Sequence, residues 1–597
     1  MPSYKAPIRD TQFILNEVLD ISQYASLRGF ADATPDLVSA ILEEGAKFVE
    51  EITQPLNLSG DEHGCVRHAD GSVTTPSGFK AAYDQLVEAG WGGLAADPAY
   101  GGQGLPHVVA NAFEEFMISA NMAFTMYIGL TQGAIAAITA VGSEEQKSTF
   151  IPQMVAGTWS GTMNLTEPHC GTDLGLLRTR AEPQSDGSYQ ITGTKIFISA
   201  GEHDLTENII HLVLAKMPDS PDSVRGISLF VVPKFLVNAD GSLGERNTVA
   251  CGSLEEKMGI HGNSTCVMNY DGAIGYLIGE RDKGMRAMFV MMNAARLGVG
   301  MQGLAQSEVA YQNAVAYAQD RLQGRSLTGP KNADGQADPI IVHPDVRRML
   351  LNVKAFNEGA RALALWGALQ VDLTHCAETE EQRQEADDLI GLLTPVIKGY
   401  FTDKGYENAT NAQQCLGGHG YIREWGLEQF VRDARIAMIY EGTNGIQALD
   451  LVGRKLARHG GRALRTYVGK IKTYIALHRD TQGMDEFVGP LDVALEDLQK
   501  STSWLMANAM TNADNAGAAS MPYLYLMGIM SLGFMWAQIA EAALKSLASG
   551  AADADFYENK LRTARYFFSH MLPETAIHRT RVEAGSKNLM EMDAQAF

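Results

Sequence analysis

The feature that most constrains the fold is a change in hydrophobic period along the chain. Before Gly157, apolar residues recur at helical steps of three, four and seven, as at Leu37, Ile41, Phe48, Val49 and Ile52. After Gly157, short β-branched or aromatic runs alternate with turn-forming residues, at positions 189–192, 196–198, 209–214, 227–232 and 266–270. The helical period returns at Gly284. This order predicts an antiparallel all-β domain, without crossover helices, between two helical blocks.

The two helical blocks differ in the loops that separate their helices. In the first block, a glycine-rich loop at 97–106 is interpreted as a tight turn ahead of one or two buried helices over 107–142. The second block is predicted to contain helices at 285–323, 343–373, 386–411 and 426–440. A polar loop at 329–339 interrupts them, and the charged run 376–388 is interpreted as a solvated helix face.

The chain is too long to enclose one core. It has 597 residues, whereas domains usually have about 100 to 200. Helical patterns at 489–500 and 523–548 predict an added α-helical domain, in which the strongly apolar 523–537 is a buried or interface helix. We expect an N-terminal arm (1–35), an N-terminal α-helical domain (36–157), a central β domain (158–283), a C-terminal α-helical domain (284–460) and an additional α-helical domain (461–597).

Charge and cysteine usage narrow the functional class. Acidic residues outnumber basic ones 70 to 48, and this net charge of −22 argues against nucleic acid as a general partner. The six cysteines form no CxxC pair and have no metal-ligand spacing with histidine, which predicts a reducing compartment and no metal site. We find no signal peptide and no apolar run of about 18 residues or more. We therefore expect a cytoplasmic protein without a membrane span.

Glu441 is the candidate catalytic base. It follows Ile436, Met438, Ile439 and Tyr440 and precedes a Gly-Thr-Asn-Gly break. Apolar surroundings disfavour the charged carboxylate and raise its pKa toward the range useful for proton abstraction at neutral pH. Taken alone, a glutamate at this position is more often a capping or solvated side chain at a helix end.

An ordered set of motifs favours Glu441 as the catalytic base. The set is Leu165-Thr166-Glu167-Pro168, Gly171-Thr172-Asp173, Gly193-Thr194-Lys195-Ile196-Phe197-Ile198-Ser199, Arg296, Arg321, Gln414-Cys415-Leu416-Gly417-Gly418-His419-Gly420 and Ile439-Tyr440-Glu441-Gly442-Thr443. In this order the motifs resemble those of the acyl-CoA dehydrogenases. The resemblance implies an α+β multidomain fold: an N-terminal α-helical domain, a central antiparallel β-barrel and a C-terminal four-helix bundle, here followed by the added α-helical domain.

The resemblance also implies a chemistry and a cofactor, FAD. Glu441 would remove the α-proton of an acyl-CoA thioester, and the β-hydrogen would pass to FAD as hydride, giving a trans-2-enoyl-CoA. The residues that match flavin contacts of the family are Met163, Leu165, Thr166, Phe197, Ser199, Arg321, Gln414, Gly417, Gly418 and Thr443. Those that match contacts to the acyl-CoA are Thr172, Asn293, Arg296, Tyr440 and Gly442.

The resemblance further implies partners. Arg321 matches an arginine that reaches the FAD pyrophosphate of a neighbouring subunit, so we expect a homodimer, with electron-transfer flavoprotein as electron acceptor. For the substrate, fatty acyl-CoA of β-oxidation and 3-methylmercaptopropionyl-CoA of dimethylsulfoniopropionate catabolism are rivals. The acyl chain length depends on pocket depth among helices such as 110–130, which composition does not reveal.

A DNA-associated flavoprotein, as in the alkylation-response branch of the superfamily, is the alternative from another class. It would use the basic residues Arg454, Lys455, Arg458, Arg462, Arg465, Lys470 and Lys472. In an acidic chain, a solvated helix face or subunit contact is the simpler interpretation. The Gly298-x-Gly300-x-x-Gly303 pattern lacks a preceding β-branched strand, so we interpret it as close helix packing rather than dinucleotide binding. We assign no role to His169, Cys170 or His419.

Overall fold

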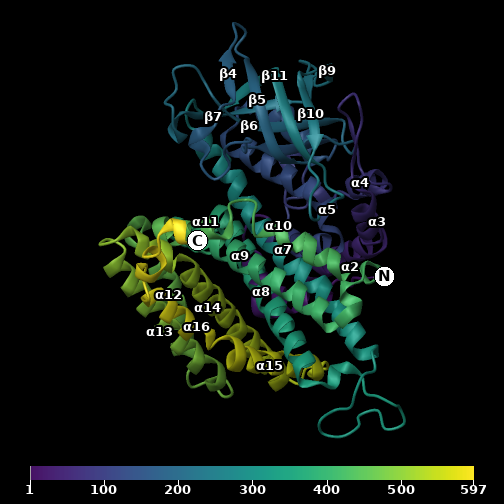
Figure 1. Ribbon diagram of the computed structural model, residues 1–597, viewed down its shortest axis with the longest axis vertical. Coiled ribbons are helices and arrows are strands. Elements are labelled where there is room, and N and C mark those ends of the chain that lie inside the picture. The colour runs from purple at the N-terminus through teal and green to yellow at the C-terminus, as the bar shows by residue number, and fades with distance from the viewer. Residues whose placement is uncertain (1) are drawn as a thin grey trace. The chain divides into compact units, whose positions relative to one another are not determined.

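The computed structural model describes residues 2–597 and divides into two compact units (Figure 1). The barrel unit comprises Lys47–Leu105 and Ala120–Gly298. The helical unit comprises the residues up to Ala46, Pro106–Ser119 and Val299–Phe597. Two long helices, α5 (His107–Val141) and α7 (Gly284–Asp320), run from one unit into the other.

The helices of the barrel unit follow the predicted period. They are α3 (Pro55–His63), α4 (Phe79–Glu88), the second half of α5 and α6 (Glu144–Val155). Asn121 interrupts α5 with a non-helical backbone (φ −159°, ψ 89°), so 107–142 contains two helices. A capping box formed by Ser143 and Gln146 starts α6. The glycine-rich loop is a tight turn in which the backbone returns close to itself. A Cβ on Gly102 would lie 2.1 Å from the carbonyl oxygen of Ala96, so only glycine fits there.

The strands of the barrel unit form a closed ring (Figure 1). Its members pair in the order β11–β5–β4–β6–β7 and back to β11, while β10 extends it beside β11 and β3 beside β6. The strands are β3 (Trp159–Asn164), β4 (Arg180–Pro183), β5 (Tyr189–Ser199), β6 (Asn208–Lys216), β7 (Ile227–Pro233), β10 (Val249–Leu254) and β11 (Thr265–Ile278). Two short ribbons, β1 (Val66–Arg67) with β2 (Val73–Thr74) and β8 (Phe235–Val237) with β9 (Leu243–Arg246), lie outside the ring.

The predicted barrel is confirmed, but its strands are not all antiparallel. β3 pairs with β6 in parallel over its whole length, and β4 meets β6 in parallel at a single position. The two runs expected at 189–192 and 196–198 form one strand, β5, that continues through Gly193. Parallel pairing joins segments far apart in the chain, so the local period could not reveal it.

β6 shows why its sequence is continuously apolar. Ile210, Leu212 and Leu214 pack in a cluster with α5, α6 and the start of α7, whereas Val213 and Ala215 belong to a second cluster with Phe230 and Met268. Both faces of the strand are therefore buried, and a strand buried on both faces lacks polar alternation.

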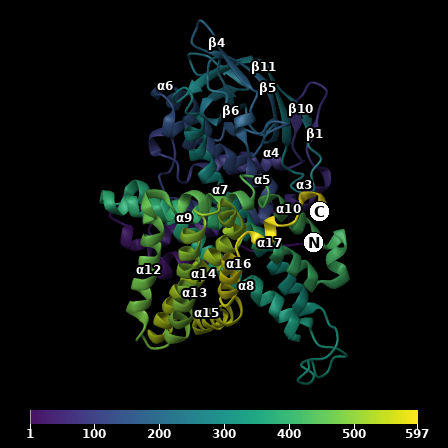
Figure 2. The same ribbon diagram turned by 60° about the vertical axis from the view of Figure 1, so that its left-hand side comes forward.

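The helical unit is built on long helices (Figure 2). They are α7, α8 (Pro344–Cys376) and α9 (Glu380–Cys415), with the shorter α1 (Ile8–Phe13), α2 (Pro35–Phe48), α10 (Leu427–Ala437) and α11 (Asn444–Asp450). The Gly-x-Gly-x-x-Gly pattern lies inside α7, where a Cβ on Gly303 would be 2.4 Å from the carbonyl oxygen of Phe401 in α9. The interpretation of this pattern as close helix packing is confirmed.

The added helices pack around a central one, α14 (Ala513–Ala548). They are α12 (Arg462–His478), α13 (Asp485–Asn508), α15 (Ala554–Tyr566), α16 (Glu574–Glu583) and α17 (Lys587–Met590). The indole N–H of Trp536 in α14 donates to the carbonyl of Ala355 in α8 at 2.9 Å, and a Cβ on Gly528 would be 2.3 Å from the ring of Tyr400 in α9. The prediction of a buried helix here is confirmed.

Within residues 2–597, two helices are long and apolar enough to cross a membrane, by length and composition. They are α5 and α14, whose most apolar windows are 50% and 89% buried within the protein. Core helices of water-soluble proteins pass the same test. The burial of α14 fits its place at the centre of the added helices.

A buried ionic cluster joins the N-terminal arm to four helices of the helical unit. The guanidinium of Arg361 in α8 binds Glu115 of α5, Glu308 of α7 at 3.0 Å, and Asp10 of α1. Lys560 of α15 binds Asp10 as well, and lies 2.8 Å from Glu358. Burial opposes ionisation of Asp10, but Lys560 and Arg361 outweigh it and lower the pKa of Asp10 to about 2.

Candidate active site

Five predicted flavin contacts lie together on two adjacent segments of the barrel unit. They are Met163, Leu165, Thr166, Phe197 and Ser199, from the end of β3 and the end of β5. The backbone N–H of Ile196 donates to the carbonyl of Thr166 at 2.9 Å, which joins the two segments. Residues about 30 positions apart in the sequence are thereby placed side by side, as the resemblance implies.

Phe197 has the properties expected of a residue that faces a ligand. Its side chain is 60% exposed, and its backbone is left-handed, with φ of 60°. An exposed aromatic ring gains little from burial, and a left-handed backbone costs a non-glycine residue about 1 to 2 kcal/mol. Such strain tends to be retained at functional sites. An uncovered aromatic face beside two hydroxyl side chains, Thr166 and Ser199, suits a planar polar ring such as a flavin.

A buried ion pair between Lys195 and Glu167 lies beside these strand ends. Lys195, fully buried, donates to the carbonyl of Leu165 at 3.0 Å and to the carboxylate of Glu167 at 2.9 Å. Burial lowers the pKa of Lys195 to about 8, against the opposing effect of Glu167. Sequence reasoning missed this role, although a lysine directly before the apolar run Ile196 to Ile198 was the available signal.

Glu167 also belongs to a group with ligand-like geometry. One ligand atom from each of Glu167, His169 and Cys170 lies within 4.8 Å of the others. The carboxylate of Glu167 already accepts hydrogen bonds from Lys195, from the hydroxyl and N–H of Thr179, and from the N–H of Arg178. These donors from the protein satisfy the carboxylate of Glu167.

In the helical unit, Glu441 lies in a short loop between α10 and α11 and is half-buried. Its φ is 56° and that of Gly442 is 81°, so two successive residues are left-handed. Among residues 2–597, eight non-glycine residues have a positive φ, and Phe197 and Glu441 are two of them. Both were singled out from motifs alone, and both now show the strained backbone found at functional sites.

Buried side chains hold the carbonyls of this loop. The ammonium of Lys398, in α9, donates to the carbonyl of Gly442 and to the side-chain oxygen of Asn444, each at 2.8 Å. The amide of Gln447 donates to the carbonyls of Glu441 and Gly442, each at 3.1 Å. Sequence reasoning missed Lys398 too, which lies in the apolar run 389–401.

Tyr440, predicted as a substrate contact, is fixed by its hydroxyl. The phenol donates to the side-chain oxygen of Gln302 in α7. Burial raises the pKa of Tyr440, so the phenol stays neutral over the working range of pH. Thr443, predicted as a flavin contact, is exposed and immediately precedes α11.

Three predicted flavin contacts, Gln414, Gly417 and Gly418, and Arg321 form a second group at one end of the helical unit. All four are exposed. The hydroxyl of Tyr317, one turn before Arg321, lies 2.9 Å from Nδ1 of His419, whose ring stacks on Trp425 at 4.5 Å. Gln414 lies about 24 Å from Lys398 along α9, at 1.5 Å per residue. This group and the Glu441 loop are therefore separate within one chain.

The remaining predicted substrate contacts belong to the barrel unit. Thr172 is exposed in the segment that follows Thr166. Asn293 and Arg296 are one turn apart on α7, where Asn293 is exposed and Arg296 is 5% exposed. The guanidinium of Arg296 lies 6.0 Å from the ring centre of Phe289.

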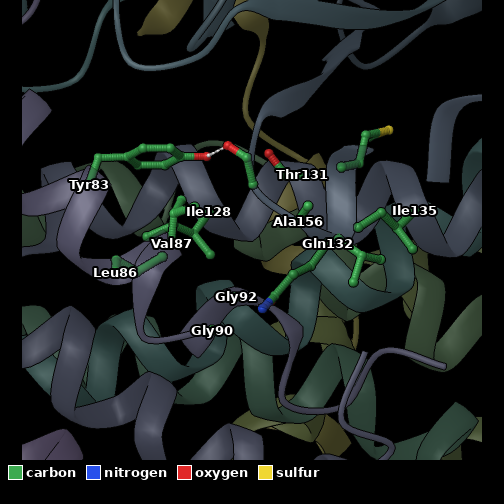
Figure 3. Close-up of a pocket in the computed structure, with 13 residues that line it drawn as sticks. Tyr83, Leu86, Val87, Gly90, Gly92, Ile128, Thr131, Gln132, Ile135 and Ala156 are labelled. Atoms are coloured by element: carbon green, nitrogen blue, oxygen red, sulfur yellow. Dashed lines mark hydrogen bonds between the residues drawn. The ribbon is translucent and has the colours of Figure 1, made fainter. Parts of the chain in front are cut away.

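A small pocket opens between α4, α5 and the end of α6 (Figure 3). It is lined by Leu86, Val87, Ile128, Ile135 and neighbouring residues, and the hydroxyl of Tyr83 donates to the carbonyl of Gly157 at 3.0 Å at its edge. Its volume of about 30 Å³ is close to that of one or two water molecules. It is too small to hold an acyl chain.

Three residues of the basic stretch 454–472 pair with neighbouring acids. Arg454 pairs with Asp450 at 2.6 Å, Arg462 with Asp388 and Lys470 with Glu385, each at 2.5 Å. Phosphate binding would have to displace these partners. The interpretation as a solvated, internally paired face fits better than a DNA surface, and absence of DNA binding stays a prediction.

Comparison with protein families accounts for almost the whole chain. Models described as the acyl-CoA dehydrogenase N-terminal, middle and C-terminal domains match residues 40–158, 162–273 and 282–457. A fourth, described as acetyl-CoA dehydrogenase C-terminal like, matches residues 467–593. The chain belongs to the acyl-CoA dehydrogenase family. It is therefore an oxidoreductase of an FAD-dependent family.

Individual members of the family match this chain over nearly its full length. The 3-methylmercaptopropionyl-CoA dehydrogenase of Ruegeria pomeroyi is 44% identical over 98% of this chain and 99% of its own. The broad-specificity linear acyl-CoA dehydrogenase FadE5 of Mycobacterium tuberculosis is 34% identical over 100% of both chains. An acyl-CoA dehydrogenase from Bacillus anthracis, solved with FAD, has the same fold with a TM-score of 0.72 at 20% identity, covering 94% of this chain and 90% of its own. The resemblance found in the motifs is thus confirmed, and so is the predicted fold class.

Proposed function

We propose that this acyl-CoA dehydrogenase acts on a short acyl-CoA thioester, with 3-methylmercaptopropionyl-CoA as the first candidate. The observation that carries the proposal is the 44% identity, over nearly the full length of both chains, to an enzyme named for that substrate. FadE5, at 34% identity, is named for linear acyl-CoA. A linear fatty acyl-CoA, as in β-oxidation, is therefore the second candidate.

In the proposed reaction Glu441 removes the α-proton of the thioester. The apolar neighbours of the loop and the exclusion of water would favour the neutral acid that forms. Lys398 and Gln447 hold the carbonyls of the loop, so the backbone that carries the Glu441 side chain is fixed. Bound FAD supplies the acceptor for the β-hydrogen, and Met163, Leu165, Thr166, Phe197 and Ser199 would hold its ring.

The substrate proposal is tested with a matched pair of thioesters. 3-Methylthiopropionyl-CoA and pentanoyl-CoA have the same chain length and differ in one atom, sulfur or CH2. Each is mixed anaerobically with the flavin-loaded protein while flavin absorbance is followed. We expect bleaching with both and a higher kcat/KM for the thioether, by roughly 10-fold, the discrimination typical of one group in an apolar pocket.

Longer esters separate the two candidates. If octanoyl-CoA and palmitoyl-CoA match or exceed the thioether in kcat/KM, the second candidate replaces the first. If no thioester of the series bleaches the flavin, the dehydrogenation itself is contradicted.

We also propose a homodimer in which Arg321 contacts the FAD pyrophosphate of the neighbouring subunit. In support, Arg321, Gln414 and Gly417 are exposed, and their group lies far along α9 from the Glu441 loop of the same chain. A guanidinium fork can make two charge-assisted bonds to a phosphate.

We propose electron-transfer flavoprotein as the electron acceptor and the cytoplasm as the location.

Replacing Arg321 with Ala is expected to weaken FAD binding about 10- to 100-fold, since hydrogen bonds to charged groups contribute about 1.5 to 3 kcal/mol. Flavin retained after gel filtration at low concentration measures the effect, and sedimentation reports the oligomer. Arg423 is the control, because it lies beside the same group but outside the motif set. An active, flavin-loaded monomer of the wild type would contradict the arrangement.

A further inference from the structure

A chain of hydrogen bonds, partly or fully buried, connects the added helices to the loop that carries Glu441. At one end, the hydroxyl of Tyr525, in α14, donates to Oδ2 of Asp403 in α9 at 2.8 Å. The other carboxylate oxygen, Oδ1, accepts from the side-chain amide of Asn444 at 2.6 Å. Asn444 is the first residue of α11 and is 6% exposed. The added domain thus reaches the loop through two side chains.

Asn444 passes the connection on to the loop backbone. Its side-chain oxygen accepts from Lys398 at 2.8 Å, and the same ammonium donates to the carbonyl of Gly442 at 2.8 Å. The backbone N–H of Asn444 donates to the carbonyl of Met438 at 3.2 Å. Asn444 therefore closes the loop 438–444 from within, while Asp403 and Lys398 fix its side chain from behind.

The loop needs such support because its backbone is strained. Glu441 and Gly442 are both left-handed, with φ of 56° and 81°. A strained conformation persists only where the surroundings over-determine it. Charge-assisted hydrogen bonds are stronger than neutral ones, and a connected network of them holds a single geometry.

We infer that Tyr525 is a positioning residue for Glu441, so that the added C-terminal helices help to set the geometry of the catalytic loop. The connection runs from Tyr525 through Asp403 and Asn444 to Lys398 and the carbonyl of Gly442. The inference rests on the proposed function, since it takes Glu441 as the base. It gives the added helices a part in the reaction beyond enlarging the core.

Replacing Tyr525 with Phe isolates the hydroxyl. The ring lies edge-on to Tyr400 at 5.7 Å and stacks on His578 at 5.3 Å, and Phe keeps both contacts. Tyr523 is a matched control in the same helix: it is buried, and its hydroxyl lies 2.7 Å from that of Thr502, within the added helices. Tyr523→Phe removes a comparable hydrogen bond that has no path to Glu441.

The first measurement is hydrogen exchange of the backbone amides of 438–447 in the flavin-loaded protein. We expect Tyr525→Phe to raise exchange in this peptide about 10-fold, and Tyr523→Phe to leave it unchanged. This readout does not depend on the chemistry. Unchanged exchange in Tyr525→Phe would overturn the inference.

The second measurement is anaerobic flavin reduction by the most reactive thioester. For Tyr525→Phe we expect an unchanged Kd for the thioester, a limiting rate about 10-fold lower, and a larger isotope effect with α-deuterated substrate, because proton removal becomes more limiting. A lower rate with an unchanged isotope effect would mean general loosening and would contradict the positioning role. If exchange responds while the wild type reduces no flavin with any thioester, the connection stands and the proposed function fails.

Discussion

Replacing Glu441 with Gln is expected to abolish flavin reduction while leaving the protein folded and flavin-loaded. Gln preserves the volume and hydrogen-bonding shape of the side chain but removes the basic carboxylate. Loss of a general base costs about 10² to 10⁴ in rate, and water cannot easily substitute in a closed site. The measurement is anaerobic mixing with 3-methylthiopropionyl-CoA and pentanoyl-CoA while the flavin absorbance is followed.

The loop backbone should keep its conformation in this variant, because its carbonyls are held independently of the Glu441 carboxylate. They are held by Lys398 and Gln447, neither of which bonds through the replaced carboxylate in doing so. FAD content and thioester affinity should therefore stay within about twofold of the wild type. Glu574→Gln, at the start of α16, is a control for loss of one negative charge. Bleaching of Glu441→Gln at the wild-type rate would assign the base to another residue.

Replacing Arg361 with Met should produce the largest loss of stability. Arg361 is 1% exposed and binds three carboxylates, of Asp10, Glu115 and Glu308. Met fills similar space but leaves these acids without their shared cation. Removing one partner of a buried ionic group costs about 3 to 5 kcal/mol, because the remaining charge is uncompensated. The midpoint of urea unfolding, followed by circular dichroism, measures the change.

The exposed pair of Arg479 with Asp492 is the matched control. Its two atoms are 2.8 Å apart, but the side chains are 62% and 49% exposed. Such pairs contribute about 0 to 1 kcal/mol, so Arg479→Met should shift the midpoint little. Because the chain has two compact units, only the earliest transition is compared. Equal shifts for the two variants would mean that the buried cluster contributes no more than a surface pair.

The prediction from sequence was strongest where information is local. The helical steps before residue 157 and after 284 correspond to α2, α7, α8, α9 and α14. The ends of α7 and α8 differ from the prediction by a few residues, whereas α14 begins at Ala513 rather than at the predicted 523. The glycines of α7 were assigned to close packing, and this is observed. Both predictions depend on residues within about one or two turns of each other, which a linear pattern contains.

Strand pairing was predicted less well, for a physical reason. The pairing of β3 with β6 joins residues 159–164 to 208–213, and no local period specifies which distant strand a segment will meet. β3 and β4 were not predicted as strands at all. Their polar residues, such as Thr162 and Asn164, are buried by partners that the sequence does not identify, as in the 2.8 Å bond between the Tyr270 hydroxyl and Asn164.

The sequence by itself determined the order of helical and strand segments, the family and Glu441 as the candidate base, because these depend on periodicity and on contiguous motifs. Only the tertiary structure decided how that base is held. The left-handed backbone of Glu441, the ammonium of Lys398 and the hydroxyl of Tyr525 come from three separate helices or loops. Burial removes their polar groups from water, so each must find a partner from a distant part of the chain. That requirement, rather than any local preference, joins the added helices to the loop of Glu441.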